Sequence, residues 1–303
     1  MSFETLLPLI TTTNFKAVAR AISLVENEVE GYMSFLQKLP ANSSTKIIGI
    51  TGPPGAGKST LVDALIATLI ANHKTVAVLC VDPSSPFNLG AILGDRVRMA
   101  SWHSNPQVYI RSLATRGSLG GLHPKIIEIT DILCAAQFDY ILVETVGVGQ
   151  SEIEVVGLAD TTVVVLVPEG GDAIQTMKAG LMEIADIFVV NKADRPEADK
   201  YLLNLQQMLA PVYSNATWQV PILKTEALNN KGITELVTQI ELHLQQPTTK
   251  TKKAWLLTQK AMQLITKHYT AHINQAALLK NITAAMAQPS FNLYTFVSTF
   301  IKA

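Results

Sequence analysis

The chain has 303 residues and 48% of them are hydrophobic, so it is long enough to bury one large core with helical additions. Its 24 basic residues balance its 24 acidic ones, which gives no basic excess for a nucleic-acid partner. Two cysteines, no signal-peptide pattern and no apolar run of membrane-spanning length exclude a disulfide framework and a membrane partner, and predict a reducing cytoplasm.

The first predicted element is an amphipathic helix over residues 14–38, which Asn14 could cap. Apolar residues recur there at three- and four-residue steps, which places them on one helix face; they are Phe15, Val18, Ala19, Ile22, Val25 and Val29. A polar linker follows from Pro40. We therefore expect residues 1–45 to form an N-terminal helical extension.

From Lys46 onward, short apolar runs alternate with stretches of helix length. The runs are 47–51, 75–81, 140–143, 162–167 and 187–190, with 221–224 as a candidate last strand. The stretches 58–72, 124–136 and 173–185 suit crossover helices, and 231–245 suits a closing helix. Runs that are apolar on both faces are typical of parallel strands covered by helices on both sides. The sequence thus predicts an α/β domain with a doubly wound, mostly parallel sheet over residues 46–247.

The composition changes after Pro247, where a basic, polar hinge begins. Apolar residues then recur at helical spacing over 254–287, which predicts one helical tail. Such a tail cannot bury its apolar face alone, so we expect it to pack on the core or on another subunit. Residues 248–303 are accordingly predicted to be a C-terminal helical extension.

A phosphate-binding loop follows the first predicted strand and opens a helix. It has the pattern G-x-x-x-x-G-K-[ST], formed by Gly52, Pro53, Pro54, Gly55, Ala56, Gly57, Lys58, Ser59 and Thr60. Its glycines let backbone N–H groups turn toward phosphate oxygens, at a helix N-terminus that favours anions. Lys58 supplies a charge to the β- and γ-phosphates, and the Ser59 hydroxyl suits Mg²⁺. A chance glycine-rich turn is the alternative, but the flanking strand and helix oppose it.

The segment Asn191-Lys192-Ala193-Asp194 is an N-K-x-D motif at the end of an apolar strand. One carboxylate at Asp194 can accept hydrogen bonds from the N1–H and the amino group of guanine, whereas adenine would leave it unpaired. The stem of Lys192 can cover the base, and Asn191 can tie the neighbouring loops together. The alternative is an ordinary turn with a capping Asp. A weaker signal is Glu226-Ala227-Leu228, where a backbone N–H could face the guanine carbonyl oxygen.

Acidic residues also stand at two other strand ends, at Asp82 and Glu144. Ligands of parallel α/β sheets bind beyond the carboxyl ends of the strands, and Mg²⁺ prefers oxygen ligands. Ser59, Asp82, Asp95 and Glu144 are therefore the candidate Mg²⁺ residues, with turn capping as the alternative for the acids.

Glu144 also begins a segment similar to D-x-x-G, in which the amide of Gly147 would sense the γ-phosphate. Val148 stands where a water-orienting Gln is usual, and Gln150 lies two residues further on. We therefore expect slow hydrolysis that a partner accelerates. The glycine-rich segments 88–98 and 115–121 are interpreted as loops near the phosphates. Arg96, Arg98 or Arg116 in them could stabilise transition-state charge, but a structural ion pair is the favoured interpretation of each.

Together these motifs resemble the MeaB/ArgK family of P-loop GTPases, chaperones of methylmalonyl-CoA mutase and related adenosylcobalamin-dependent mutases. The resemblance covers residues 15–245 and rests on segments 19–26, 52–60, 81–86, 90–99, 115–121, 144–152 and 191–194. It implies a P-loop NTPase fold, GTP and GDP as substrate and product, Mg²⁺, a mutase partner and a homodimer joined through the C-terminal helices. It also implies a third switch at 168–180 with Gln175 and Lys178. Lys58, Glu144, Gly147 and Lys178 are then the candidate catalytic residues.

Two other functions remain open at this stage. A GTPase metallochaperone would need clustered Cys and His, but the six histidines are scattered along the chain. A P-loop kinase of a small molecule is disfavoured by the N-K-x-D motif and by the lack of a recognisable acceptor-binding lid.

Overall fold

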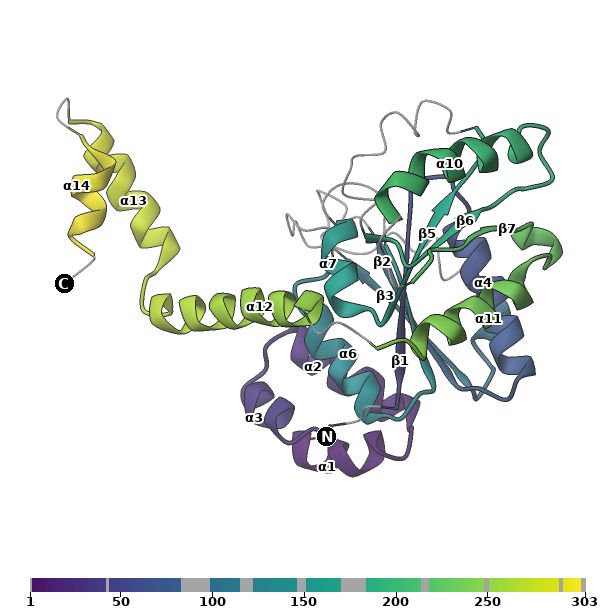
Figure 1. Ribbon diagram of the computed structural model, residues 1–303. Coiled ribbons are helices and arrows are strands. Elements are labelled where there is room, and N and C mark those ends of the chain that lie inside the picture. Colours follow the sequence, from purple (N-terminus) through teal and green to yellow (C-terminus); the bar gives the residue numbers. More distant parts are fainter. Residues whose placement is uncertain are drawn as a thin grey trace. The chain divides into compact units, whose positions relative to one another are not determined.

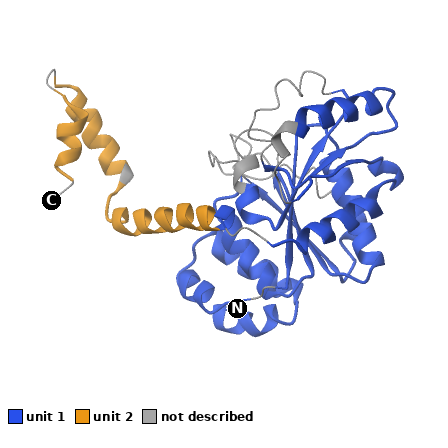
Figure 2. Cartoon of the chain, in the orientation of Figure 1, with its two compact units in different colours: residues 1–253 blue, residues 254–303 orange. Residues whose placement is uncertain are grey.

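The computed structural model describes residues 2–41, 44–82, 99–114, 122–145, 151–169, 184–213, 218–247, 251–288 and 291–300. Its contacts divide the chain into two compact units, Met1–Lys253 and Ala254–Ala303 (Figure 2). The first unit carries the sheet and all the predicted nucleotide-binding motifs.

Unit 1 is built on a seven-stranded sheet in which every pair of neighbouring strands is parallel. The strands are β1(Lys46–Thr51), β2(Val76–Asp82), β3(Val108–Ala114), β4(Tyr140–Glu144), β5(Thr161–Leu166), β6(Ile187–Val190) and β7(Ile222–Lys224). Their order in space is β3-β2-β4-β1-β5-β6-β7 (Figure 1). The predicted α/β fold is confirmed, including the last strand. The sequence prediction missed β3, because Arg111 and Ser112 interrupt its apolar run.

Helices cover both faces of the sheet (Figure 1). They are α4(Lys58–Ala71), α6(Ile126–Ala135), α7(Ser151–Leu158), α10(Ala198–Tyr213) and α11(Ile233–Leu244), with short 3-10 turns η1(Ala100–Trp102) and η2(Ala227–Asn229). Side chains alternate along each strand. Val163 and Val165 of β5 pack in the core with α4 and α11, whereas Val164 and Leu166 pack with α10. The sheet is therefore doubly wound.

The N-terminal segment contains α1(Phe3–Ile10), α2(Phe15–Glu26) and α3(Tyr32–Gln37). Asn14 caps α2 as predicted, since its Oδ1 accepts the Ala17 N–H at 3.1 Å. The single helix predicted over 14–38 is wrong. Glu28 has a φ of 50°, a left-handed conformation that a right-handed helix cannot continue through, so the chain turns between α2 and α3.

The predicted single tail also proves to be separate helices, namely α12(Thr251–Thr270), α13(Gln275–Met286) and α14(Leu293–Ser298). The helix α12 ends at Thr270, and Asn274 starts the next helix, because its side chain caps α13 by accepting the Ala277 N–H at 3.0 Å. An N-cap residue has extended backbone, which is incompatible with an uninterrupted helix. Unit 2 leaves large apolar side chains of all three helices exposed.

Candidate functional site

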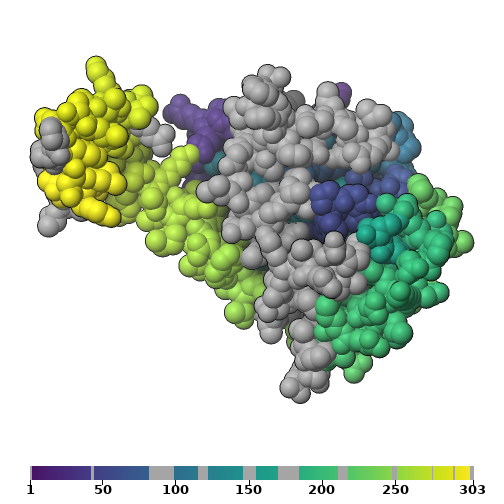
Figure 3. All heavy atoms as spheres, turned by 90° about the horizontal axis from the view of Figure 1, so that it is seen from above, coloured from purple at the N-terminus to yellow at the C-terminus, as the bar shows by residue number. Residues whose placement is uncertain are grey.

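The phosphate loop connects the end of β1 to the start of α4. Gly52 has a φ of +141°, and a Cβ there would lie 2.1 Å from the Val165 carbonyl oxygen. Gly57 has a φ of +85°, and a Cβ there would lie 2.5 Å from Asn191 Nδ2. Both positions therefore require glycine, because a side chain would collide with β5 or with the predicted guanine-reading loop. Figure 3 shows atoms in the colour of this segment at the surface, beside the green of residues 190–213.

Lys58, the first residue of α4, is buried along the loop. Its Nζ donates to the carbonyl oxygens of Gly52 at 2.9 Å and Pro53 at 3.1 Å. A charged ammonium is thus held against the loop that the motif assigns to phosphates. Carbonyl oxygens can exchange for phosphate oxygens as its hydrogen-bond acceptors without moving the helix.

Ser59 and Glu144 come together at the carboxyl edge of the sheet. The Ser59 hydroxyl donates to Glu144 Oε1 at 2.6 Å, and the Glu144 side chain is buried. Beside them, the Thr145 hydroxyl donates to that of Thr51 at 3.0 Å. A carboxylate and a hydroxyl in contact are hard oxygen donors of the kind that Mg²⁺ accepts. These residues therefore fit the predicted metal.

The two threonines were not among the predicted site residues. Thr51 ends β1, and Thr145 directly follows β4. These two strands are neighbours in the sheet. A polar residue at the end of each of two apolar runs was the signal that could have identified them. Sequence alone does not say that the two runs pair, so the juxtaposition was not predictable.

Asn191 joins three loops, as its position in the motif predicted. Its Nδ2 donates to the Ala56 carbonyl oxygen of the phosphate loop at 3.0 Å. Its Oδ1 accepts the Thr225 hydroxyl at 3.0 Å and the Ala227 N–H at 3.2 Å. Since the side chain is buried, these bonds fix the phosphate loop relative to the segment that follows β7.

Lys192 and Asp194 lie on the turn after Asn191. Lys192 has a φ of 56° and is half-buried. Its Cε lies 4.0 Å from the position that a Cβ would take if Gly57 had a side chain. Asp194 is exposed, so its carboxylate can reach a ligand. The turn is held to the neighbouring loop by the Ala193 N–H, which donates to the Thr225 carbonyl oxygen at 3.0 Å.

The segment from Glu226 to Leu228 forms a closed turn. The Glu226 N–H donates to the Lys231 carbonyl oxygen at 3.1 Å, and the Ala227 N–H is used by Asn191. Lys231 and Asn229 donate to the Glu226 carboxylate and lower its pKa. Of the three N–H groups expected near a guanine carbonyl, two already donate within the protein. The third residue, Leu228, has a strongly exposed side chain, and the contact of this segment with the guanine carbonyl oxygen stays a prediction.

Several predicted site residues are outside what the structure describes. Asp95, Gly147 and Lys178 lie outside the described residues, and so do Gln150 and Gln175. The backbone of Asp82 ends β2, the strand beside β4, so it reaches the same sheet edge as Glu144. The metal and catalytic assignments at these positions stay predictions.

The described residues offer no second site of two other kinds, a metal site and a membrane span. Within them, no group of three or more His, Cys, Asp and Glu side chains could hold a metal ion, so the metallochaperone alternative finds no cargo site there. None of the described helices combines the length and apolar character of a membrane span.

The fold has a counterpart among solved structures. The crystal structure of a LAO/AO transport system kinase has a TM-score of 0.66 and 24% identity, and the match covers 98% of this chain and 95% of that one. At this identity the likeness shows the shared fold.

Sequence relatives are closer. A protein of Pyrococcus abyssi, named as a GTPase, is 49% identical over 232 residues, which are 75% of this chain and 72% of that protein. GTPase ArgK of Escherichia coli is 37% identical over 72% of this chain and 69% of its own length. The methylmalonic aciduria type A homolog of Caenorhabditis briggsae is 34% identical over 74% of this chain and 59% of its own.

The family match extends over most of the chain. Residues 18–287 match the family described as "Methylmalonyl Co-A mutase-associated GTPase MeaB". The match includes the phosphate loop, the Ser59–Glu144 pair and the Asn191 junction. The chain therefore belongs to the MeaB family of methylmalonyl-CoA mutase-associated GTPases, enzymes that hydrolyse GTP.

Proposed function

We propose that this protein binds GTP, hydrolyses it to GDP and phosphate with Mg²⁺, and acts as a chaperone for an adenosylcobalamin-dependent acyl-CoA mutase of the methylmalonyl-CoA type. The observation that carries the nucleotide part is the Asn191 junction, which holds the phosphate loop against the two turns assigned to guanine. A phosphate site and a base site at fixed separation suit one nucleotide.

The phosphate end works by charge and by oriented donors. Backbone N–H groups of residues 52–57 face the β- and γ-phosphates at the N-terminus of α4. Lys58 leaves the Gly52 and Pro53 carbonyl oxygens and donates to phosphate oxygens instead. Ser59 and Glu144, with Asp82 and Asp95, would hold Mg²⁺ directly or through water. When bound, Mg²⁺ neutralises charge that develops on the phosphates during transfer.

The base end selects guanine. Asp194 accepts two hydrogen bonds from the guanine edge, and the Leu228 N–H donates to the guanine carbonyl oxygen. The Lys192 stem lies along one face of the ring. Because Asn191 fixes both turns before any nucleotide binds, the turns lose little conformational entropy on binding, and this favours affinity.

The chaperone part is supported by three observations. The family description names the mutase, and the relative from C. briggsae is named after methylmalonic aciduria. The chain also has Val148 where a water-orienting Gln is usual. Without that Gln, GTP hydrolysis is expected to be slow until a partner accelerates it. Gln175 and Lys178 of the third switch are the residues through which we expect the mutase to act.

The test measures GTP turnover with and without the adenosylcobalamin-dependent mutase of the same organism. We expect the mutase in excess to raise turnover at least tenfold, and Lys178→Ala to lose most of that stimulation while keeping its affinity for GDP. A mutase that neither binds the protein nor changes its turnover refutes the chaperone role. Full stimulation of the Lys178→Ala variant refutes only the assigned route.

A further inference from the structure

Two buried threonine hydroxyls meet where β1 and β4 end, and the nucleotide motifs do not account for them. Thr51 and Thr145, here called the threonine pair, are 0% and 2% exposed, and the Thr145 hydroxyl donates to that of Thr51 at 3.0 Å. Burying a hydroxyl costs free energy, and valine would fill the same space in a strand without that cost. The threonine pair therefore indicates a role besides packing.

The pairing of β1 with β4 brings the two hydroxyls together. Ile50 lies opposite Glu144 in the last register pair of these strands, and the threonine pair follows one residue later. The Thr145 N–H donates to the Ile50 carbonyl oxygen at 3.0 Å. The hydroxyl contact thus adds a side-chain link at the carboxyl edge of the sheet, beyond the register pairs of the two strands.

The threonine pair lies on the opposite face of the sheet from Ser59, because side chains alternate along a strand. Ile50 packs in the core with α4, and Glu144 contacts Ser59 of that helix. A Cβ on Gly49 would lie 2.8 Å from a side chain of α7, so Gly49 and Thr51 face α7. The end of β4 is therefore held on both faces of the sheet, by the Glu144 carboxylate on one and by the hydroxyl of the next residue on the other.

The other member of the pair, Thr51, precedes the phosphate loop. Gly52 follows it directly, and the Gly52 carbonyl oxygen accepts Lys58 Nζ at 2.9 Å. The Val165 carbonyl oxygen fills the space of a Cβ on Gly52, so this part of the loop lies tightly against β5. Because the peptide unit between Thr51 and Gly52 is planar and rigid, fixing Thr51 restricts where the loop begins. The threonine pair thus connects the phosphate loop to the strand end that carries Glu144.

Mg²⁺ makes the spacing of these two segments important. The ion binds oxygen ligands at about 2.0–2.1 Å in a nearly octahedral arrangement. In this site it would join the nucleotide phosphates to Ser59 and Glu144, and such sites need their ligands held to within about 0.5 Å. A phosphate loop that could shift relative to Glu144 would still bind phosphates, but the site would bind Mg²⁺ less tightly.

We propose that Thr51 and Thr145 are positioning residues for Mg²⁺, and that the contact between their hydroxyls fixes the spacing between the phosphate loop and Glu144. The proposal rests on the proposed function, in which Mg²⁺ accompanies the nucleotide. It adds to the site two residues whose hydroxyls bind each other rather than a ligand.

The test measures the release of a fluorescent GDP analogue from the full-length protein at increasing Mg²⁺ concentrations. Thr145→Val keeps the branched side chain and removes the hydroxyl. We expect it to raise the Mg²⁺ concentration that half-maximally slows GDP release by about fivefold or more, the order of effect of one hydrogen bond, while the release rate in EDTA stays within about twofold of wild type. Thr145→Ser keeps a hydroxyl and should restore the wild-type Mg²⁺ response.

Thr51→Val breaks the same contact from the other side, which keeps the proposal testable if Thr145→Val folds poorly. It should reproduce the shift in the Mg²⁺ response. With both substitutions together, the shift should be no larger than with either one alone, because they remove one shared contact.

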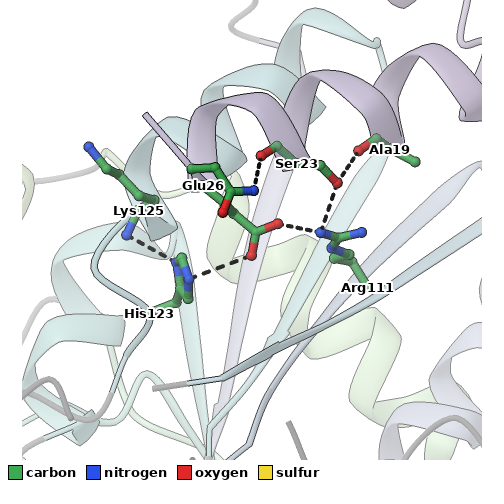
Figure 4. Close-up of polar contacts among 7 residues, drawn as sticks. Ala19, Ser23, Glu26, Arg111, His123 and Lys125 are labelled. Atoms are coloured by element: carbon green, nitrogen blue, oxygen red, sulfur yellow. Dashed lines mark hydrogen bonds and ion pairs between the residues drawn. The ribbon is translucent and has the colours of Figure 1, made fainter. Parts of the chain in front are cut away.

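Ser23→Ala is the matched control, because the Ser23 hydroxyl also joins a helix to a strand. It donates to the Ala19 carbonyl oxygen of α2 at 3.0 Å and accepts from Arg111 of β3 at 3.3 Å (Figure 4). Since β3 is an edge strand and α2 carries no nucleotide motif, this variant should leave the Mg²⁺ response unchanged.

Three results would overturn the proposal. A lower melting temperature of Thr145→Val with an unchanged Mg²⁺ response would make the threonine pair merely structural. Equal acceleration of GDP release with and without Mg²⁺ would place the defect in the phosphate loop itself, and a Thr145→Ser variant that fails to recover would rule out the hydroxyl. A wild-type protein whose GDP release does not respond to Mg²⁺ would refute the proposed Mg²⁺-dependent function and the positioning role with it, and this failure is distinguishable because it appears without any substitution.

Discussion

At the scale of single residues, the candidate site depends on side chains that serve two loops at once. Asn191 contacts the phosphate loop through its amide nitrogen and the turn after β7 through its oxygen. Gly57 must be a glycine partly because Asn191 occupies the space of a Cβ. Replacing Asn191 would therefore leave buried polar groups unpaired both in the phosphate loop and in the turn after β7. The free energy of unfolding should fall by more than the loss of one hydrogen bond would cause.

Asp194 carries the choice of base, and its exchange gives a prediction at this scale. In Asp194→Asn, one hydrogen-bond acceptor becomes a donor, so the variant should prefer xanthine over guanine nucleotides. We expect GDP affinity to fall at least 50-fold, a loss of about 2.3 kcal/mol, and XDP affinity to rise. Competition against a labelled nucleotide measures both.

The matched control for this experiment is Asp199→Asn. Asp199 is also exposed, but it lies on α10 and pairs with Lys224 at 2.7 Å, so its loss should leave base preference unchanged. Equal competition by ATP and GTP in the wild-type protein would contradict the guanine assignment itself.

At the scale of elements, α11 is joined to the starts of β5 and β6 by a polar cluster around His243. The Thr161 hydroxyl lies 2.9 Å from His243 Nδ1, and Asp186 Oδ1 lies 3.5 Å from Nε2. The Trp218 ring packs edge-on against the imidazole, and its Nε1 donates to the Asp186 carbonyl oxygen at 2.8 Å. This cluster occupies the edge of the sheet opposite the nucleotide site.

Burial lowers the pKa of His243, and Asp186 only partly opposes this shift. The unfolded chain therefore binds a proton more readily than the folded one, so the free energy of unfolding should fall as the pH drops below about 6.5, by at most about 1.4 kcal/mol per pH unit. In His243→Gln this part of the dependence should disappear. Urea unfolding between pH 5 and 8 measures it, and the exposed His103→Gln is the control. An unchanged pH profile in His243→Gln would contradict the assignment.

At the scale of the whole molecule, the helices of unit 2 leave many of their large apolar side chains exposed. Trp255, Met262, Ile265 and Tyr269 of α12 are each half or more exposed. Exposed apolar surface of this kind marks an interaction site, and the proposed occupant is a second copy of the chain, joined through the C-terminal helices.

We expect the purified protein to be a dimer in light scattering coupled to size-exclusion chromatography. Introducing Met262→Asp together with Ile265→Asp should shift it to a monomer at micromolar concentration, because two charges would be buried without partners. Gln263→Asp, on an exposed polar position of the same helix, should leave the dimer intact. A monomeric wild-type protein would refute the homodimer.

Features whose signal is local could be predicted from the amino-acid sequence. The phosphate loop, the N-K-x-D turn and the Asn14 cap depend on neighbouring residues, so the pattern alone placed them. The doubly wound sheet also followed from runs that are apolar on both faces. The predictions of single helices over 14–38 and 254–287 were wrong for a local reason as well. Apolar periodicity does not reveal a residue with left-handed backbone, such as Glu28, or a helix-capping residue, such as Asn274.

Tertiary structure alone decided which distant residues meet. Ser59 and Glu144 are 85 positions apart, and Arg111 and Glu26 are also 85 apart. No periodicity connects residues at such separation, since their contact depends on the order of strands in the sheet. The sequence prediction missed β3 for a related reason. Arg111 places a charged side chain in its apolar run, and the partners of that side chain, Glu26 and Ser23 on α2, are distant in the sequence.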